Sequence, residues 1–515
     1  MSLAELEIVN DKKTAPRGVA APLRRRFLVP SLLPVLLSLL LGLWGIRRDE
    51  KVWHDEAATL GLASRSLPDL WQTLGTIDAV HGAYYLVMHG LFGLFGTDLL
   101  VLRLPSVLAG ALAAAGVTAL GGRLAGTRAG VLAGLSFALL PAVQRYAQEG
   151  RSYALVCALV VWATYFLVSA VLGCRAPAST GRARPAAPWI AYGALMLAAC
   201  ILHQFAALAL VAHAVALPGR ARRPWARTAL VVAVGAAPLA ALGMAQSEQV
   251  AWINGVTGGQ YQRFAIQFSL AIVLFHFASP RNAGRACPEV PFSLRAIALP
   301  LFVLPTVLLV LISLYKPFYV ERYVLYGFVG LALLLGAVLD RVSELGRSPR
   351  VTAVVVVAVA IGLLVPESLK VRTPESRSDD VTELARVLSR EAAPGDAILY
   401  LSVKRRAWTL AYPWLSRRMF DLAQELTPEA SHGLYGTELP SSQIRARMRG
   451  SERIVVVTEP QGNRVERTET ERMKERVLAE YFTKDHAARI NGAQVIVYES
   501  RAAATATARA ERAVP

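Results

Sequence analysis

The stretch AYYLVMHGLFGLF, from Ala83 to Phe95, determines the predicted number of membrane crossings and therefore the predicted topology. It is apolar throughout, but a helix that spans the hydrocarbon core of a bilayer needs about 20 residues. We therefore expect this stretch to form a helix that lies along the membrane surface and does not cross it.

Apolar runs dominate the rest of the chain, and 54% of its 515 residues are hydrophobic. The run from Leu28 to Leu43 contains no charged residue, which is typical of a segment buried in lipid. Further apolar runs predict eleven spanning helices in all, several of them shorter than a full span and therefore tilted or partly embedded. They lie near residues 27–46, 103–122, 129–143, 152–172, 189–202, 204–217, 228–245, 264–278, 296–314, 323–339 and 351–366.

Basic residues fix the predicted orientation. If Ala83–Phe95 does not cross, the basic loops Arg123–Arg128, Arg175–Arg184 and Arg220–Arg227 all lie on the same side as Arg24–Arg26. Loops on the cytoplasmic side carry an excess of Lys and Arg. We therefore expect a cytoplasmic N-terminus and an extracytoplasmic C-terminal part. The Arg- and Ala-rich, Lys-poor composition suggests a bacterial cytoplasmic membrane.

The net charge of +18 could also indicate a nucleic-acid-binding protein. We reject that interpretation because the arginines lie mostly between apolar runs, as expected for membrane helices. The cysteines, Cys157, Cys174, Cys200 and Cys287, show no CxxC spacing, so neither a metal-binding cluster nor a disulfide framework is predicted. The first apolar run is long enough to span and no small-residue cleavage site follows it, so we expect no cleavable signal.

Four regions are predicted: a cytoplasmic tail (1–26), a transmembrane catalytic domain (27–366), an extracytoplasmic α/β domain (367–500) and a disordered end (501–515). Within the third region, helical patterns at 380–392 and 468–482 alternate with strand patterns at 397–403, 453–458 and 493–498. The fold class is therefore an α-helical polytopic membrane protein with a small C-terminal α/β domain.

Polar residues of the predicted outer face lie in loops that are far apart in the sequence. Acidic, basic and aromatic groups at a lipid boundary suit a substrate with an anionic head and an apolar tail. The candidates are Trp53, His54, Asp55, Glu56, His81, Glu149, Arg151, Tyr153, Trp252, Lys316, Arg322 and Tyr323.

These residue types predict transfer of a sugar from a polyprenyl-phosphate carrier, because nucleotide sugars are absent outside the cell. Asp55 is the candidate base for the acceptor hydroxyl. Arg322, Lys316 and Arg151 are candidates for holding the leaving phosphate. The plainer alternatives are that the acids solubilise a loop and that the cations anchor helix ends in the headgroup region. The histidines have no helical metal spacing, so a hydrogen-bonding role is favoured over metal binding.

Five motifs occur in the order seen in a known family. They are WHDEA (53–57), DAVHGAYYL (78–86), LRLPS (102–106), QEGRSY (148–153) and PFYVERY (317–323). Together they resemble the GT-C membrane glycosyltransferases, specifically family 39, which includes protein O-mannosyltransferases and the transferase that adds aminoarabinose to lipid A. The sequence departs from that family at Gly82-Ala83, where the family usually has Pro-Pro.

The resemblance implies a GT-C fold and an inverting transfer, with mannose as the favoured sugar. It assigns catalysis to Asp55, with Glu56 beside it, and acceptor-site shaping to Glu149. Arg322 and Tyr323 would line the donor cavity. His81 is expected near the donor phosphate, and Trp53, His54, Tyr153 and Trp252 near the sugar or acceptor.

The expected partners are membrane lipid, a polyprenyl-phosphate sugar and an acceptor protein, glycolipid or polysaccharide, without nucleic acid. No cofactor is expected, although related oligosaccharyltransferases use a metal ion, so a divalent metal stays open. Two other functions also stay open. One is a transporter or flippase for a lipid-linked or anionic substrate, and the other is a non-catalytic scaffold that displays the C-terminal domain.

Overall fold

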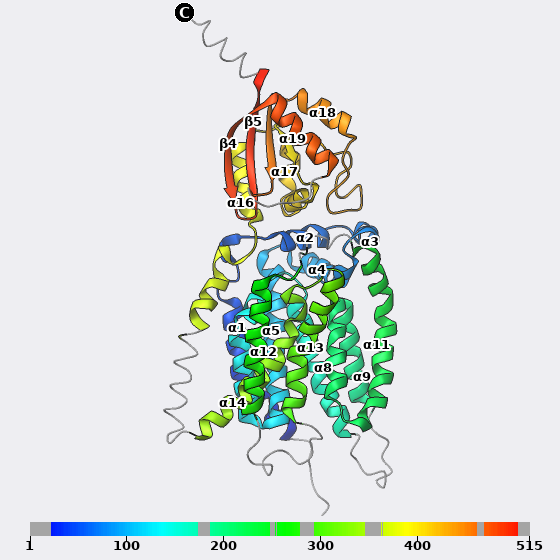
Figure 1. The fold of residues 1–515 in the computed structure, drawn as a ribbon, viewed down its shortest axis with the longest axis vertical. Helices are drawn as coiled ribbons and strands as arrows, with labels where there is room; N and C mark the ends of the chain where they lie inside the picture. The colour runs from blue at the N-terminus through cyan, green and yellow to red at the C-terminus, as the bar shows by residue number, and fades with distance from the viewer. Residues whose placement is uncertain are drawn as a thin grey trace, which may run out of the picture.

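Long helices form a bundle, and a five-stranded sheet lies beyond one end of it (Figure 1). The structure is a computed structural model that describes residues 22–173, 186–247, 253, 255–278, 293–345, 362, 364–460 and 468–502. Several predictions fall on residues outside these ranges: Trp252, Cys174, Cys287, most of the eleventh predicted span (351–361 and 363), most of the N-terminal tail and residues 503–515.

The bundle contains a helix at each of the first ten predicted spans. They are α1 (Pro22–Leu43), α5 (Leu99–Ala125), α6 (Thr127–Leu139), α8 (Tyr153–Gly173), α9 (Ala187–Leu202), α10 (Leu208–Ala216), α11 (Gly219–Ala245), α12 (Gly258–Phe277), α13 (Leu294–Tyr315) and α14 (Phe328–Leu345).

Not all of these helices are full-length spans. Within the described ranges, six are long and apolar enough to cross a membrane: α1, α5, α8, α11, α13 and α14, the last counted with the 3-10 helix η6 (Glu321–Gly327). A seventh is added if α6 and the short α7 (Pro141–Ala147) count as one span with a 64° bend. Helices α9 and α10 are shorter apolar helices, so apolarity alone overstated the number of full-length spans.

Small residues let the helices approach one another closely. A Cβ atom on Gly330 of α14 would collide with the carbonyl oxygen of Ala298 on α13. A Cβ atom on Gly130 of α6 would likewise meet the backbone of Thr118 and Gly122 on α5. Lipid tails are as apolar as leucine, so such backbone contact is a main source of helix association in membranes.

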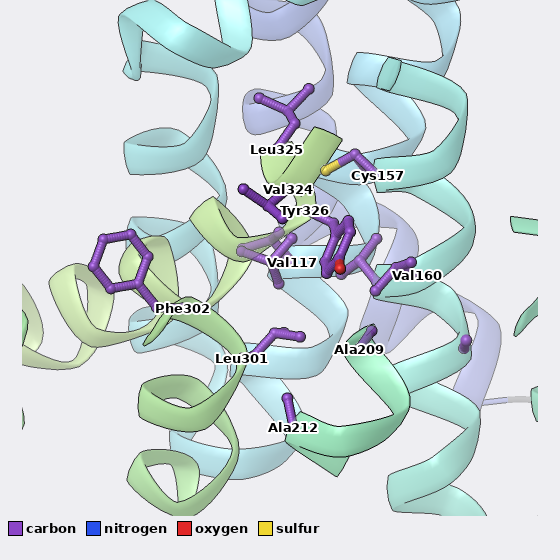
Figure 2. Packing of buried hydrophobic residues seen from close by; sticks show 14 of the residues in the cluster. Val117, Cys157, Val160, Ala209, Ala212, Leu301, Phe302, Val324, Leu325 and Tyr326 are labelled. Carbon is purple, nitrogen blue, oxygen red and sulfur yellow. The ribbon is translucent and has the colours of Figure 1, made fainter. Parts of the chain in front are cut away.

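Buried side chains inside the bundle pack against η6 and fix its position. Figure 2 shows Tyr326 and its neighbours Val324 and Leu325 packed among buried side chains such as Val117 and Val160. The Tyr326 hydroxyl donates to the Phe205 carbonyl at 2.8 Å, so its polar end is also satisfied. The fixed segment is the one that carries Arg322 and Tyr323.

Three short helices lie across the end of the bundle that faces the sheet (Figure 1): α2 (His54–Ala63), α3 (Leu67–Thr76) and α4 (Gly82–Phe95). Ser66 caps α3 by accepting from the Asp69 backbone N–H, and Gly96 ends α4 with a φ of 82°. Helix α4 has 14 residues, so the helix predicted over Ala83–Phe95 is present and is shorter than a full span.

The C-terminal part folds as predicted into alternating helices and strands. Its sheet has the order β2-β1-β3-β5-β4, parallel at β2-β1-β3 and antiparallel at β3-β5-β4. The predicted elements are α16 (Val381–Glu391), β1 (Ala397–Tyr400), β3 (Arg453–Thr458), α19 (Glu469–Tyr481) and β5 (Ala493–Ser500). The sequence did not predict β2 (Phe420–Asp421), α17 (Pro413–Arg418), α18 (Ser441–Arg449), the 3-10 helix η8 (Val403–Ala411) or β4 (Phe482–Ile490).

Candidate active site

Asp55 lies in the first turn of α2, where the extended backbone of Trp53 turns into the helix. Its carboxylate pairs with Arg322 at 3.2 Å and lies 4.0 Å from Arg151. On its other side, His54 Nε2 is 3.1 Å from Asp55 Oδ1. Burial alone would raise the pKa of Asp55, but the two arginines and the histidine outweigh burial and hold the pKa well below its usual range.

Aromatic rings enclose the guanidinium of Arg322. Its Nε donates to the Tyr153 hydroxyl at 3.1 Å. The rings of Trp53, Tyr153 and Tyr323 have centroids 5.4, 5.6 and 5.7 Å from its Cζ atom, within the range of cation–π attraction. The cation is therefore held by aromatic faces as well as by Asp55.

Arg151 joins the same cluster from the loop before α8. Its Nη1 donates to the Tyr85 hydroxyl on α4 at 3.0 Å, and that hydroxyl in turn donates to Asp78. Asp78 adopts a left-handed conformation with a φ of 61°, and burial raises the pKa of its carboxyl. Arg151 thus connects the first-loop helices to the bundle.

Glu56 points into a different group of charges. It is fully buried, and both of its oxygens accept from Arg103, at 2.8 and 2.7 Å. Arg48 lies 3.2 Å away, and the Gly150 backbone N–H donates to Glu56 at 3.1 Å. Burial alone would raise the pKa of Glu56, but its cationic neighbours lower it to about 2.

Glu149 is also held away from Asp55. Its carboxylate is buried and pairs with Arg377 at 3.0 Å, with Arg145 a turn away at 3.9 Å. Arg377 belongs to the segment that leads into α16, and it also donates to the Arg145 carbonyl at 3.0 Å. Glu149 therefore connects the bundle to the C-terminal part.

His54 bridges two carboxylates. Its Nδ1 is 2.5 Å from Asp379, whose other oxygen accepts from the His54 backbone N–H at 2.7 Å. Burial alone would lower the pKa of His54, but Asp379 and Asp55 raise it to about 10. Below that pH, His54 is an imidazolium that donates to both acids.

Two further histidines line the cluster. His81 and His203 are buried with their ring centroids 5.9 Å apart, and His203 lies 4.6 Å from the Tyr323 ring. Among the described residues, the Nδ1 atoms of both histidines have no hydrogen-bond partner. Burial and the nearby Arg151 hold the pKa of His81 well below its usual range, so the ring is neutral.

The structure brings most of the predicted site residues together around Asp55. The group includes Trp53, His54, His81, Arg151, Tyr153, Arg322 and Tyr323. Lys316 does not join it, because its ammonium donates to Ser247 at 2.6 Å and lies over the Phe318 ring. The prediction that Lys316 holds the phosphate is thus not supported by its contacts.

Sequence reasoning missed Tyr85, Arg103, His203 and Asp379. Tyr85 and Arg103 lie inside the motifs DAVHGAYYL and LRLPS, so the sequence does contain a signal for both residues. His203 and Asp379 stand alone between elements and carry no local signal. Over the described part of the chain, no group of three or more His, Cys, Asp and Glu residues is placed to hold a metal ion.

Comparison with solved structures identifies the fold. The crystal structure of ArnT from Cupriavidus metallidurans in the apo state superposes with a TM-score of 0.58 and 13% identity, covering 90% of this chain and 97% of that chain. The structure of the same protein bound to undecaprenyl phosphate gives a TM-score of 0.54 and 14% identity, with the same coverage of both chains.

These matches show that the chain has the GT-C membrane fold, which confirms the predicted fold class. At such low identity they show the fold alone, and the narrower resemblance to family 39 stays a prediction. No family model matches the sequence, and no curated protein matches it.

Proposed function

We propose that this protein is a membrane glycosyltransferase that moves a sugar from a polyprenyl-phosphate carrier to an acceptor hydroxyl. One observation carries the proposal: the Asp55 carboxylate lies 3.2 Å from Arg322, in an aromatic enclosure at one end of a GT-C bundle. A carboxylate beside a fixed cation suits group transfer, because the carboxylate can take a proton while the cation stabilises the negative charge that develops on the leaving group.

In the proposed step, the acceptor oxygen attacks the anomeric carbon while the bond from that carbon to the phosphate oxygen breaks. The electron pair of that bond stays with the polyprenyl phosphate, and the acceptor proton passes to Asp55. Attack opposite the leaving group inverts the anomeric centre. Arg322 and Arg151 would stabilise the charge that develops on the phosphate.

The free site keeps Asp55 ionised but weakly basic, because Arg322, Arg151 and His54 hold its pKa low. A phosphate that enters beside the two arginines would share their positive charge. The pKa of Asp55 would then rise toward its ordinary value, and Asp55 would become a better base only when the donor is bound.

Support for the donor class comes from the fold match. ArnT, which shares this fold, has been solved bound to undecaprenyl phosphate. In this chain we assign Arg322, Arg151, His81 and Tyr323 to the donor, with Trp53, Tyr153 and Trp252 proposed for sugar or acceptor contacts. His54, assigned to that group by the sequence, is paired with two acids instead.

Glu56 and Glu149 receive different roles from the catalytic ones that the sequence suggested. Each carboxylate is buried in ion pairs with arginines other than Arg322. Neither faces the group that Asp55 faces, so we propose that both hold loops in place and do not touch substrate.

The resemblance to family 39 makes mannose the proposed sugar. The acceptor is proposed to be a protein, glycolipid or polysaccharide at the outer face of a bacterial cytoplasmic membrane. This location places the sheet outside and the N-terminus in the cytoplasm, as the basic loops predict.

The test is transfer from labelled polyprenyl-phosphate mannose in membranes that contain the wild type or Asp55→Asn, with polyprenyl-phosphate aminoarabinose as a second donor. We expect the wild type to label one membrane fraction and Asp55→Asn to lose at least about a hundredfold in rate. Equal labelling by both proteins would contradict Asp55 as the base. Movement of the carrier across the bilayer without bond formation would favour the transporter alternative.

A further inference from the structure

Residues 377–382 of the C-terminal part reach the candidate site beside His54. Its Val381 backbone N–H donates to the Val52 carbonyl at 2.9 Å, and the Val52 N–H donates to Thr382 Oγ1 at 2.9 Å. Lys51 pairs with Asp380 at 2.7 Å. This segment is therefore fixed to the chain immediately before α2, the helix that carries Asp55.

Asp379 makes the most direct contact of that segment. It accepts from both the backbone and the ring of His54, so one carboxylate fixes the first residue of α2 at two points. An acid at a helix N-terminus satisfies a free N–H and favours the helix dipole. The other ring nitrogen of His54 faces Asp55, so the position of Asp379 is passed on to Asp55.

The sheet contacts the segment that carries Asp379. The tight turn between β4 and β5 contains Asn491 and Gly492. The Asn491 carbonyl accepts from the Asp380 N–H at 3.1 Å, and its side chain donates to the Arg377 carbonyl at 3.0 Å. A Cβ atom on Gly492 would lie 2.5 Å from the Cβ atom of Asp379, so the turn and the acid are in direct contact.

We infer that the C-terminal part positions the catalytic carboxylate of the transfer reaction proposed above, through the chain of contacts from the β4–β5 turn to Asp379, His54 and Asp55. His54 and Asp379 are positioning residues in this scheme. The inference rests on the proposed function for the catalytic role of Asp55. The chain of contacts itself, called the mechanical link below, does not depend on any substrate.

The charges around this link define its pH dependence. His54 faces Asp55 on its own helix and Asp379 on the docked segment, while Trp408 from η8 contributes a neutral ring. Arg322 and Arg151 face Asp55. Arg48, Lys51 and Arg377 line a small pocket together with Asp379.

Hydrogen exchange over residues 54–63 tests the mechanical link. Asp379→Ala removes the acceptor of the His54 N–H, so exchange in the first turn of α2 should rise about tenfold. Gly492→Ala should raise it as well by displacing Asp379. The matched control is Gly395→Ala, because Gly395 also has a positive φ, of 92°, in a turn of the same part but has no atom within 4 Å of an added Cβ.

Exchange in Asp379→Ala and Gly492→Ala that matches exchange in Gly395→Ala would overturn the inference. This measurement needs no substrate, so it decides the inference even if the wild type transfers no sugar. Failure of the proposed function would appear separately, as an inactive wild type with an intact link.

The pH dependence of the transfer rate tests the effect of the Asp379 charge on His54. In Asp379→Asn, the amide oxygen still accepts from the His54 N–H, and the amide N–H can donate to the ring. The negative charge is gone, so the alkaline limb of the transfer rate should move down by at least about one pH unit. The same shift should appear in the pH dependence of exchange over residues 54–63. An alkaline limb identical to that of the wild type in both measurements would contradict the role of the His54 charge.

Discussion

Replacing Glu56 by Gln should destabilise the protein by breaking a buried ion cluster. The side chains of Glu56 and Arg103 are both 0% exposed, and they share two hydrogen bonds of 2.8 and 2.7 Å. A glutamine amide would accept from one arginine nitrogen but present its own N–H to the other. Removing one partner of a buried pair costs about 3–5 kcal/mol, because the remaining charge is left uncompensated.

The assay is thermal unfolding in one detergent, followed by tryptophan fluorescence, with Glu50→Gln as the control. Glu50 pairs with Arg47 in the same loop, but both side chains are about half exposed, at 54% and 48%. Such a surface pair contributes under about 1 kcal/mol. We expect a clear fall in the unfolding midpoint for Glu56→Gln and almost none for Glu50→Gln. Equal midpoints would refute the structural role of Glu56.

The same variant has a predicted signature in acid. The pKa of Glu56 is lowered from an ordinary 4.5 to about 2 in the folded protein. A lowered pKa means that the ionised form stabilises the fold above the ordinary value, and that this contribution disappears as the pH falls through 2. The difference in stability between wild type and Glu56→Gln should therefore shrink as the pH falls from 4.5 to 2.

Three further outcomes are expected. Arg322→Lys should lower transfer about 10- to 100-fold, because an ammonium cannot reproduce the forked guanidinium; an unchanged rate would remove Arg322 from the donor site. In the wild type, His54 has a pKa raised to about 10, so its charged contacts are complete below its ordinary 6.5 and the transfer rate should fall as the pH rises through 10. Gly330→Ala should reduce the yield of folded protein, since its Cβ would meet the Ala298 carbonyl. Gly93→Ala, with no atom within 4 Å, should not.

The sequence predicted the positions of the first ten bundle helices well because its signals are local, although it overstated how many of them are full-length spans. Apolar runs place the helices, and the short length of Ala83–Phe95 predicts a helix that is too short for a full span, as α4 is. The strand β4 was missed because its residues, from Phe482 to Ile490, alternate poorly and are mostly polar and exposed. Strand β4 pairs with β5, and the residue pattern of one strand does not reveal its partner.

The site was predicted in part for the same reason. Asp55 and Arg322 lie in motifs, and shared placement at one face predicted that they would meet. The sequence could not predict that Asp55 and its neighbour Glu56 have different partners. Successive residues of a helix point about 100° apart. That rotation sends one acid toward Arg322 and the other into the pocket of Arg103.

Two neighbouring acids with separate partners also explain how the site can hold so much buried charge. Each carboxylate is offset by its own cations, with Arg103 and Arg48 for Glu56 and with Arg322 for Asp55. A substrate phosphate that drew Arg322 away from Asp55 would therefore leave the Glu56 cluster unchanged. The loop can keep its shape while the charge balance at Asp55 changes. If Asp55 is a base that gains strength on donor binding, as we propose, it requires this separation.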